Sequence, residues 1–324
     1  MKKHISTIIM IALAIAVFAF IGYSMDLKTT WESIKKANFY MIGLGSITML
    51  IAHFLRGYRW NMLTETANIK LNHRRSFYSV MTGYLVNTAT SRGGEVVRCA
   101  LTAKSEKAPV ETLIGTVITE RIADLVFMLI LGILCVCIQF DQFFGFIKQY
   151  ILEPITQKPI ILVIILIAIA AIWFLIKRLT KNKSGNKDSL LGRLLIGMKS
   201  ILNLKKPLLF ALLSLAIWMG YWFGMYFQLQ ALDITVQFNL ANALGILMFS
   251  AMGIVIPIPG GAGVYGTIAF GLTLVYGLPT SEAQTFSIFN IAFSNIFHIT
   301  MGAICYGLLF FEIRKMEAKN ENIK

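Results

Sequence analysis

The sequence predicts an all-α fold: a polytopic integral membrane helical bundle with about six to eight spans and re-entrant or broken helices. Of the 324 residues, 56% are hydrophobic and 14% are charged, whereas about a quarter of a soluble chain is charged. The mean hydropathy is +0.69. The apolar residues also gather in segments near the length of about 20 residues that a bilayer requires. We therefore expect residues 1–324 to form a single transmembrane domain.

Six segments read as spans, and they are rich in Ile, Leu, Val, Phe and Met: 5–23, 39–55, 113–140, 160–176, 208–229 and 285–311. The first follows Lys2 and Lys3, as the core of a signal peptide would. It is long enough to span, and no small-residue cleavage site follows it. We therefore expect it to be a retained first span.

The net charge of +14 comes from Lys and Arg residues that lie between the apolar segments. No aromatic side chains interleave with them as in single-strand nucleic-acid binders, so we expect no nucleic-acid partner. Basic residues gather after the second span, in 177–206 and after residue 311, and the positive-inside rule makes these regions cytoplasmic. Both termini should then lie on the cytoplasmic side of a bacterial inner membrane.

Two further apolar segments are interrupted. Segment 77–89 is short and leads into Arg92-Gly93-Gly94-Glu95. The loops on both sides of it are assigned to the cytoplasm, so the segment must return to the face from which it starts. We therefore expect it to be re-entrant or to lie in the membrane interface. Segment 240–276 is broken at Pro257-Ile258-Pro259-Gly260-Gly261-Ala262-Gly263, and should be a hairpin of two helices that starts and ends outside. Such breaks survive at membrane depth only when buried or lining a water-filled cavity. Their placement suggests a transporter with inverted repeats, with a structural kink as the alternative.

Charged residues inside spans suggest a functional site unless they can snorkel to the surface. Arg56 and Arg59 follow the second span, so we expect them to anchor a helix end. Arg92, Glu95 and Arg98 are different, because Gly93 and Gly94 between them let backbone N–H groups approach a ligand. A guanidinium is the side chain that grips a phosphate with two hydrogen bonds.

The span after Pro109 places Thr116, Glu120 and Asp124 on one helical face at i, i+4, i+8. Arg121 can pair with Glu120 or with Glu95. Two carboxylates and an arginine at this depth should face the bundle interior, either as a substrate or proton-coupling site or as a structural ion-pair cluster.

The last span carries Ser287, Asn290, Ser294 and His298 near one face. Asn290, Ser294 and His298 form with Thr116 a possible polar pathway, although interhelical hydrogen bonding explains such residues as well. His53 and His298 lack sequence partners for a metal site or catalytic dyad, and no phosphate-binding loop or nucleophile elbow occurs. The four cysteines have no metal-ligand spacing and should be packing residues, so we expect no metal and no cofactor: Cys99, Cys135, Cys137 and Cys305.

Three motifs, in this order, make the sequence resemble the flippase-like, lysylphosphatidylglycerol synthase transmembrane-region family, which includes the membrane half of the multiple peptide resistance factor. They are Arg92-Gly93-Gly94-Glu95 with Arg98, Glu120-Arg121 with Asp124, and Pro257-x-Pro259-Gly260-Gly261-x-Gly263. The resemblance covers nearly the whole chain. The sequence departs from it at Thr90-Ser91, where the family often has a proline, and at Tyr265-Gly266, where many members have an acidic residue.

The resemblance implies a lipid flippase for an anionic or aminoacylated phospholipid or a polyprenyl-phosphate-linked lipid. Arg92, Arg98 and Arg121 would contact phosphate, while carboxylates orient them or accept protons: Glu95, Glu120 and Asp124. The rivals are a membrane-embedded lipid transferase and an accessory subunit that binds a lipid-modifying enzyme through residues 177–206. The family's bifunctional members continue into a soluble aminoacyl-transferase domain, and this chain ends at Lys324, so we expect no lysyltransferase activity.

Overall fold

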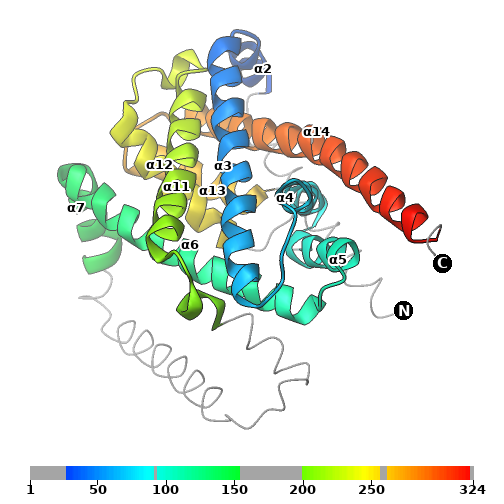
Figure 1. Cartoon of the computed structure of the whole chain (residues 1–324). Helices are drawn as coiled ribbons and strands as arrows, with labels where there is room; N and C mark the ends of the chain where they lie inside the picture. Colours follow the sequence, from blue (N-terminus) through cyan, green and yellow to red (C-terminus); the bar gives the residue numbers. More distant parts are fainter. Residues whose placement is uncertain (1–26, 91–92, 154–198, 256–260, 322–324) are drawn as a thin grey trace, which may run out of the picture.

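The computed structural model describes residues 27–90, 93–153, 199–255 and 261–321, and within these residues it is built of helices and loops without strands (Figure 1). The predicted spans at 5–23 and 160–176 lie outside the described residues. The α-helices are α2 Leu27–Lys35, α3 Phe39–Thr66, α4 His73–Ala89, α5 Gly94–Glu106, α6 Val110–Ile138, α7 Phe140–Ile147, α11 Pro207–Leu229, α12 Leu240–Val255, α13 Ala262–Leu274 and α14 Thr280–Glu321. Short irregular helices cover Lys148–Leu152, Lys199–Asn203 and Asp233–Thr235.

Four of the described helices are long and apolar enough to cross a membrane: α3, α6, α11 and residues Thr280–Met316 of α14. They confirm the predicted helical membrane class. The predicted bounds are close to those observed for α6 and α11, whereas α14 extends to Glu321 beyond the predicted end at residue 311. Helix α3 runs on to Thr66 rather than ending at residue 55. The sequence prediction stopped at the first arginine of α3, although Leu63 beyond it is fully buried.

Helices α3 and α11 pack side by side through small residues (Figure 1). A Cβ added at Gly220 of α11 would lie 3.0 Å from the Cβ of Ala52, and one at Gly224 would lie 3.3 Å from the Thr48 hydroxyl. Small residues allow this close approach, on which helix association in lipid depends. The pair forms the scaffold on which the other helices are placed.

Helices α4 and α5 form a two-helix hairpin, and Gly93, Gly94 and Glu95 of the predicted motif lie at the start of α5. Its open end is closed by an ion pair of 2.8 Å between Arg75 and Glu106. Near the turn, a Cβ at Gly83 would lie 2.9 Å from the Gly94 carbonyl oxygen, so the backbones nearly touch. The chain thus runs along α4 and back along α5. Whether this hairpin is re-entrant or interfacial stays a prediction.

Helices α12 and α13 form a second hairpin, with residues 256–260 of the turn outside the described residues. Glycines set its spacing, because an added Cβ at Gly245 would meet Tyr276, one at Gly253 would meet Thr267, and one at Gly271 would meet Phe249. These pairings run antiparallel. The end of α6 holds the open end, where Gln139 accepts from the Tyr276 hydroxyl at 2.9 Å and donates to the Ala241 carbonyl at 2.8 Å. The predicted hairpin over 240–276 is confirmed.

The long helix α14 contacts both hairpins, and their open ends lie towards its opposite ends. Arg75 of the α4–α5 hairpin donates to the sulfur of Met316, and Leu85 packs on Gly302 further back along α14. Tyr265, near the turn of the α12–α13 hairpin, clusters with Ile291. The two turns therefore approach the middle of α14 from opposite ends, and the arrangement matches the predicted pair of inverted broken elements.

Candidate functional site

Two arginines of α3 lie at the centre of a buried polar site. Arg56 is 3% exposed and Arg59 is fully buried. The expectation that they snorkel from a helix end is wrong, because α3 continues inside the bundle beyond them. Arg56 Nε donates to the Tyr221 hydroxyl at 3.1 Å, and Arg59 Nη1 donates to the Ser214 hydroxyl at 2.9 Å. Both partners come from α11, so the guanidinium groups also join α3 to α11.

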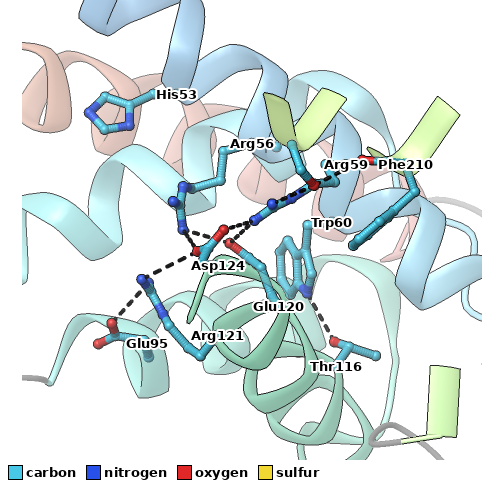
Figure 2. A network of polar contacts seen from close by, with 12 residues as sticks. His53, Arg56, Arg59, Trp60, Glu95, Thr116, Glu120, Arg121, Asp124 and Phe210 are labelled. Carbon is cyan, nitrogen blue, oxygen red and sulfur yellow. Dashed lines mark hydrogen bonds and ion pairs between the residues drawn. The ribbon is translucent and has the colours of Figure 1, made fainter. Parts of the chain in front are cut away.

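Helix α6 presents Glu120 and Asp124 to these arginines, on the face that the i, i+4 spacing predicted (Figure 2). Arg56 Nη1 lies 2.8 Å from Glu120 Oε1 and 2.9 Å from Asp124 Oδ2. Arg59 Nη2 lies 2.6 Å from Asp124 Oδ1, and Arg98 Nη2 donates to Glu120 Oε2. All four carboxylate oxygens therefore accept a hydrogen bond from an arginine.

Arg98 reaches the site from α5, so the α4–α5 hairpin contributes a buried charge. The centre of its guanidinium lies 4.0 Å from the centre of the Trp60 ring. An aromatic face offsets part of the cost of burying a cation. Trp60 is held in turn by a hydrogen bond of 2.9 Å from its Nε1 to the hydroxyl of Thr116. Thr116 thus supports the site through Trp60.

The site carries unequal charge. Its three buried guanidinium groups, those of Arg56, Arg59 and Arg98, face two buried carboxylates, and this leaves one positive charge. Two of the buried nitrogens, Arg59 Nε and Arg98 Nε, have no hydrogen-bond partner in the structure. An unbalanced charge in a low-dielectric interior is costly, and a bound anion would remove the imbalance. We call these five side chains, Arg56, Arg59, Arg98, Glu120 and Asp124, the arginine cluster.

A small pocket opens beside the arginine cluster at the α4–α5 hairpin, and Arg98 and Arg121 both line it. The side chain of Arg121 is 43% exposed, and its Nη2 lies 3.1 Å from Glu95 Oε1. The sequence left the partner of Arg121 open, and the structure pairs it with Glu95, with Asp124 more distant at 3.9 Å (Figure 2). This partly exposed ion pair lines the same pocket as the buried Arg98.

The glycines of the motif serve the hairpin turn. The Gly94 N–H donates to Asn87 Oδ1 at 2.8 Å, and the Gly93 N–H donates to the Thr90 hydroxyl at 3.0 Å. The sequence predicted that these N–H groups would face a ligand, and the structure places them on the hairpin's own side chains. A Cβ at Gly94 would overlap the Gly83 carbonyl oxygen, so glycine is needed for the close approach. Arg92 lies outside the described residues.

The remaining predicted residues lie elsewhere. Gly261 and Gly263 are at the start of α13, where no contact of the described residues joins them to the arginine cluster. Pro257, Pro259 and Gly260 lie outside the described residues. On α14, Asn290 donates to Gln228 of α11 at 2.8 Å, which is the interhelical hydrogen bond that the sequence offered as one explanation. Ser294 is half-buried.

His298 contacts a residue that the sequence did not pair with it. Its Nε2 lies 3.1 Å from the Nε2 of His53 on α3, and the two residues are 245 positions apart in the chain. Sequence reasoning also missed Arg56 and Arg59 as site residues. Their i, i+3 spacing and the apolar residues that follow them were the available signal, because a helix that stays apolar beyond an arginine does not end there. Among the described residues, no three His, Cys, Asp or Glu side chains gather as metal ligands.

Comparison with known proteins agrees with this architecture. The family model described as the lysylphosphatidylglycerol synthase TM region matches residues 7–302. A UPF0104 membrane protein of the archaeon Methanothermobacter thermautotrophicus is 25% identical over 139 residues, which cover 41% of this chain and 40% of that protein. The aligned part is thus less than half of either chain. No solved structure matches the chain.

Proposed function

This chain belongs to the lysylphosphatidylglycerol synthase TM region family, and from that premise we propose that it translocates a lipid with an anionic headgroup across the membrane. The observation that carries the proposal is the excess positive charge of the arginine cluster, buried between α3, α5 and α6. A phosphate would supply the missing negative charge, and guanidinium groups bind phosphate through two parallel hydrogen bonds. The phosphate is common to phospholipids and polyprenyl-phosphate-linked lipids.

The headgroup would reach the cluster through the pocket that Glu95 and Arg121 border. These two form a partly exposed ion pair, which can open at lower cost than the fully buried pairs of the cluster. An incoming phosphate can replace Glu95 as the partner of Arg121 and then approach Arg98. We assign Glu120 and Asp124 to holding the arginines in place, because all four of their oxygens are already occupied.

The acyl chains would remain in the bilayer beside α5 and α14. A hollow of about 310 Å³ lies between these helices, lined mainly by apolar side chains such as Leu101 and Leu309. Lys104 and Arg314 also line it. This combination fits a phospholipid whose chains lie against apolar residues and whose phosphate lies near cations.

The open end of the α4–α5 hairpin would face the cytoplasm. Basic residues gather there and at the neighbouring end of α14: Arg74, Arg75, Lys104, Lys107, Arg314 and Lys315. The positive-inside rule then assigns both termini to the cytoplasmic side of a bacterial inner membrane. With this orientation the arginine cluster is reached first from the inner leaflet, where newly made anionic lipids would be collected.

The rival activity, lipid transfer chemistry, fits the site less well. A general base needs a free lone pair within reach of the proton that it abstracts. Each oxygen of Glu120 and Asp124 already accepts from an arginine, so a carboxylate that turned towards a substrate proton would give up part of a buried ion pair. The family description leaves open a synthase as a partner, and a lipid carrier could act beside such an enzyme.

Arg98→Gln tests the proposal most sharply, because it leaves two guanidinium groups facing two carboxylates. The balanced site should still fold, whereas the attraction for an anion is lost. In proteoliposomes, the wild-type chain should move fluorescent phosphatidylglycerol between leaflets, measured by dithionite quenching, and phosphatidylcholine with the same fluorophore more slowly. The Arg98→Gln variant should lose the preference for phosphatidylglycerol.

Arg75→Gln is the matched control, since it removes one arginine from the same hairpin but outside the cluster. It should keep the lipid preference. A wild-type rate equal to that of protein-free vesicles, or a folded Arg98→Gln variant with unchanged preference, would contradict the proposed function.

A further inference from the structure

The imidazoles of His53, which is buried, and His298, which is partly buried, form a pair at mid-height of the bundle. His53 lies fourteen residues after Phe39 and thirteen before Thr66, the ends of α3. His298 lies eighteen residues from each end of the segment Thr280–Met316 of α14. The two Nε2 atoms are 3.1 Å apart, and the ring of Tyr84 stacks on His298 with centroids 4.8 Å apart and planes within 9°. Ionisable groups at this depth are expensive and usually functional.

The histidine pair can bind a proton. In the neutral pair, one Nε2 must carry a hydrogen and the other must accept it, which leaves one ring with a vacant Nδ1 and the other with an Nδ1–H. A proton added at the vacant nitrogen can be passed on as the Nδ1–H of the other ring is released, so the pair ends with as many protons as it began. Two facing imidazoles are therefore a relay as well as a binding site.

The histidine pair is linked to the arginine cluster through Tyr221. The Tyr221 hydroxyl lies 3.5 Å from His53 Nδ1 and accepts a hydrogen bond from Arg56 Nε at 3.1 Å. The same Arg56 donates to Glu120 and Asp124. A charge that arrives at either site is therefore felt at the other, two hydrogen-bond lengths away.

The groups that face the pair make its proton affinity depend on the cluster. From α3 the facing charge is Arg56, from α4 and α11 the facing groups are the tyrosines Tyr84 and Tyr221, and the ring of Phe297 packs beside it from α14. The carboxylates of α6 lie beyond Arg56 and are bound by it. A proton on the pair is thus opposed by the excess positive charge of the cluster, and a phosphate bound there removes this opposition.

We propose that the His53–His298 pair is a proton-binding site that couples proton movement to the translocation of the anionic lipid. This inference rests on the proposed function, and adds its energy source. Proton and phosphate then bind together, since by linkage each raises the affinity for the other by the same factor. Ser294 and Asn290 lie one and two turns before His298 on the same face of α14. Their polar side chains could carry a proton towards the pair from the other side of the membrane.

Calorimetry tests the coupling without transport. Binding of short-chain phosphatidylglycerol to the detergent-solubilised chain is measured in buffers of different ionisation enthalpy, which reports proton uptake. The wild-type chain should take up a proton as the lipid binds, to an extent of up to about one proton per lipid. His53→Gln and His298→Gln should bind the lipid without proton uptake, and having two variants guards against one that fails to fold.

The matched control is His73→Gln, because His73 lies at the start of α4 and bonds to Asn61, away from the pair. It should show wild-type proton uptake. Lipid binding with no proton uptake by the wild-type chain overturns the coupling and leaves the proposed function standing. Absence of lipid binding overturns both.

In proteoliposomes, an imposed pH gradient should change the initial rate of fluorescent phosphatidylglycerol movement by about fivefold or more, the lower range of ordinary coupling between sites. Movement by His53→Gln should be insensitive to the gradient. A wild-type rate that does not respond to the gradient, in vesicles where lipid does move, likewise overturns the coupling.

Discussion

The two helical hairpins approach the middle of α14 from opposite ends, yet they differ in amino-acid composition. The α4–α5 hairpin carries Glu95 and Arg98 and takes part in the arginine cluster. The α12–α13 hairpin has no charged residue in either helix. Its two helices approach each other closely because glycines lie opposite aromatic rings: Gly271 contacts the ring of Phe249, and Gly245 contacts the ring of Tyr276.

This difference in composition indicates that the two hairpins have different roles. A charged hairpin can change its partners when an anion arrives, because ion pairs reform at little cost near an exposed edge. A hairpin whose rings fill the space above glycines has no such freedom, since tightly packed interiors transmit strain and tolerate little added volume. We infer that the α4–α5 hairpin responds to the substrate while the α12–α13 hairpin holds the frame.

The largest expected loss of stability follows from removing a negative charge from the arginine cluster. Glu120→Gln leaves Arg56, Arg59 and Arg98 with Asp124 as their only buried carboxylate. Removing one partner of a buried ion pair typically costs about 3–5 kcal/mol. We expect a matching fall in the free energy of unfolding, measured by denaturant titration in mixed micelles. High concentrations of an anionic lipid should restore part of it, because the lipid supplies negative charge.

Glu65→Gln is the matched control for this substitution. Glu65 forms an ion pair of 3.1 Å with Lys205, but both side chains are largely exposed. Exposed pairs contribute about 0–1 kcal/mol, so the change should be small. Equal losses from the two variants would show that the arginine cluster tolerates an unpaired charge, and the contrast between the hairpins would lose its basis.

The Gly271→Ala substitution tests whether the α12–α13 hairpin is tightly packed. The added methyl would overlap the ring of Phe249, and overpacking of this kind costs about 1–3 kcal/mol. Gly266→Ala on the same helix has open space at the Cβ and should be neutral or stabilising, because alanine is the better helix former. Thermal unfolding of the two variants in detergent measures the difference. A stable Gly271→Ala variant would show that the α12–α13 hairpin is looser than its contacts indicate.

Part of the fold could be predicted from the sequence, because each span needs only a long apolar run and a Pro/Gly break separates two helices. The segment 240–276 was predicted as two helices for this reason. Helix α5 was not predicted, since its residues form no continuous apolar run. The end of α3 was missed, since hydropathy falls at Arg56 whether an arginine leaves the membrane or enters a buried ion pair. One-dimensional charge counts do not distinguish these two cases.

The site was predicted in part. The helical periodicity of α6 placed Glu120 and Asp124 on one buried face, and the structure finds them there. The partners come from α3, α5 and α11, and their meeting depends on how helices pack, which spacing along one helix does not encode. The contact between His53 and His298 is of the same kind, because no local pattern joins residues on two different spans.

The smallest effect concerns the turn of the α12–α13 hairpin, where Gly261 has φ of +87°. An added Cβ there would lie 3.5 Å from the Ile291 side chain, which is ordinary contact, so the cost of Gly261→Ala should come from the backbone alone. The left-handed conformation costs a non-glycine residue about 1–2 kcal/mol.

The relative stability of two variants at Gly261 distinguishes backbone strain from lack of space for a side chain. Asparagine tolerates the left-handed region better than alanine but has a larger side chain. If φ limits the position, the Gly261→Asn variant should therefore be more stable than Gly261→Ala in thermal unfolding. The reverse order would mean that space is limiting, as it is at Gly94, where an added Cβ would overlap the Gly83 carbonyl. The turns of the two hairpins would then be alike in packing, and their difference would reduce to charge.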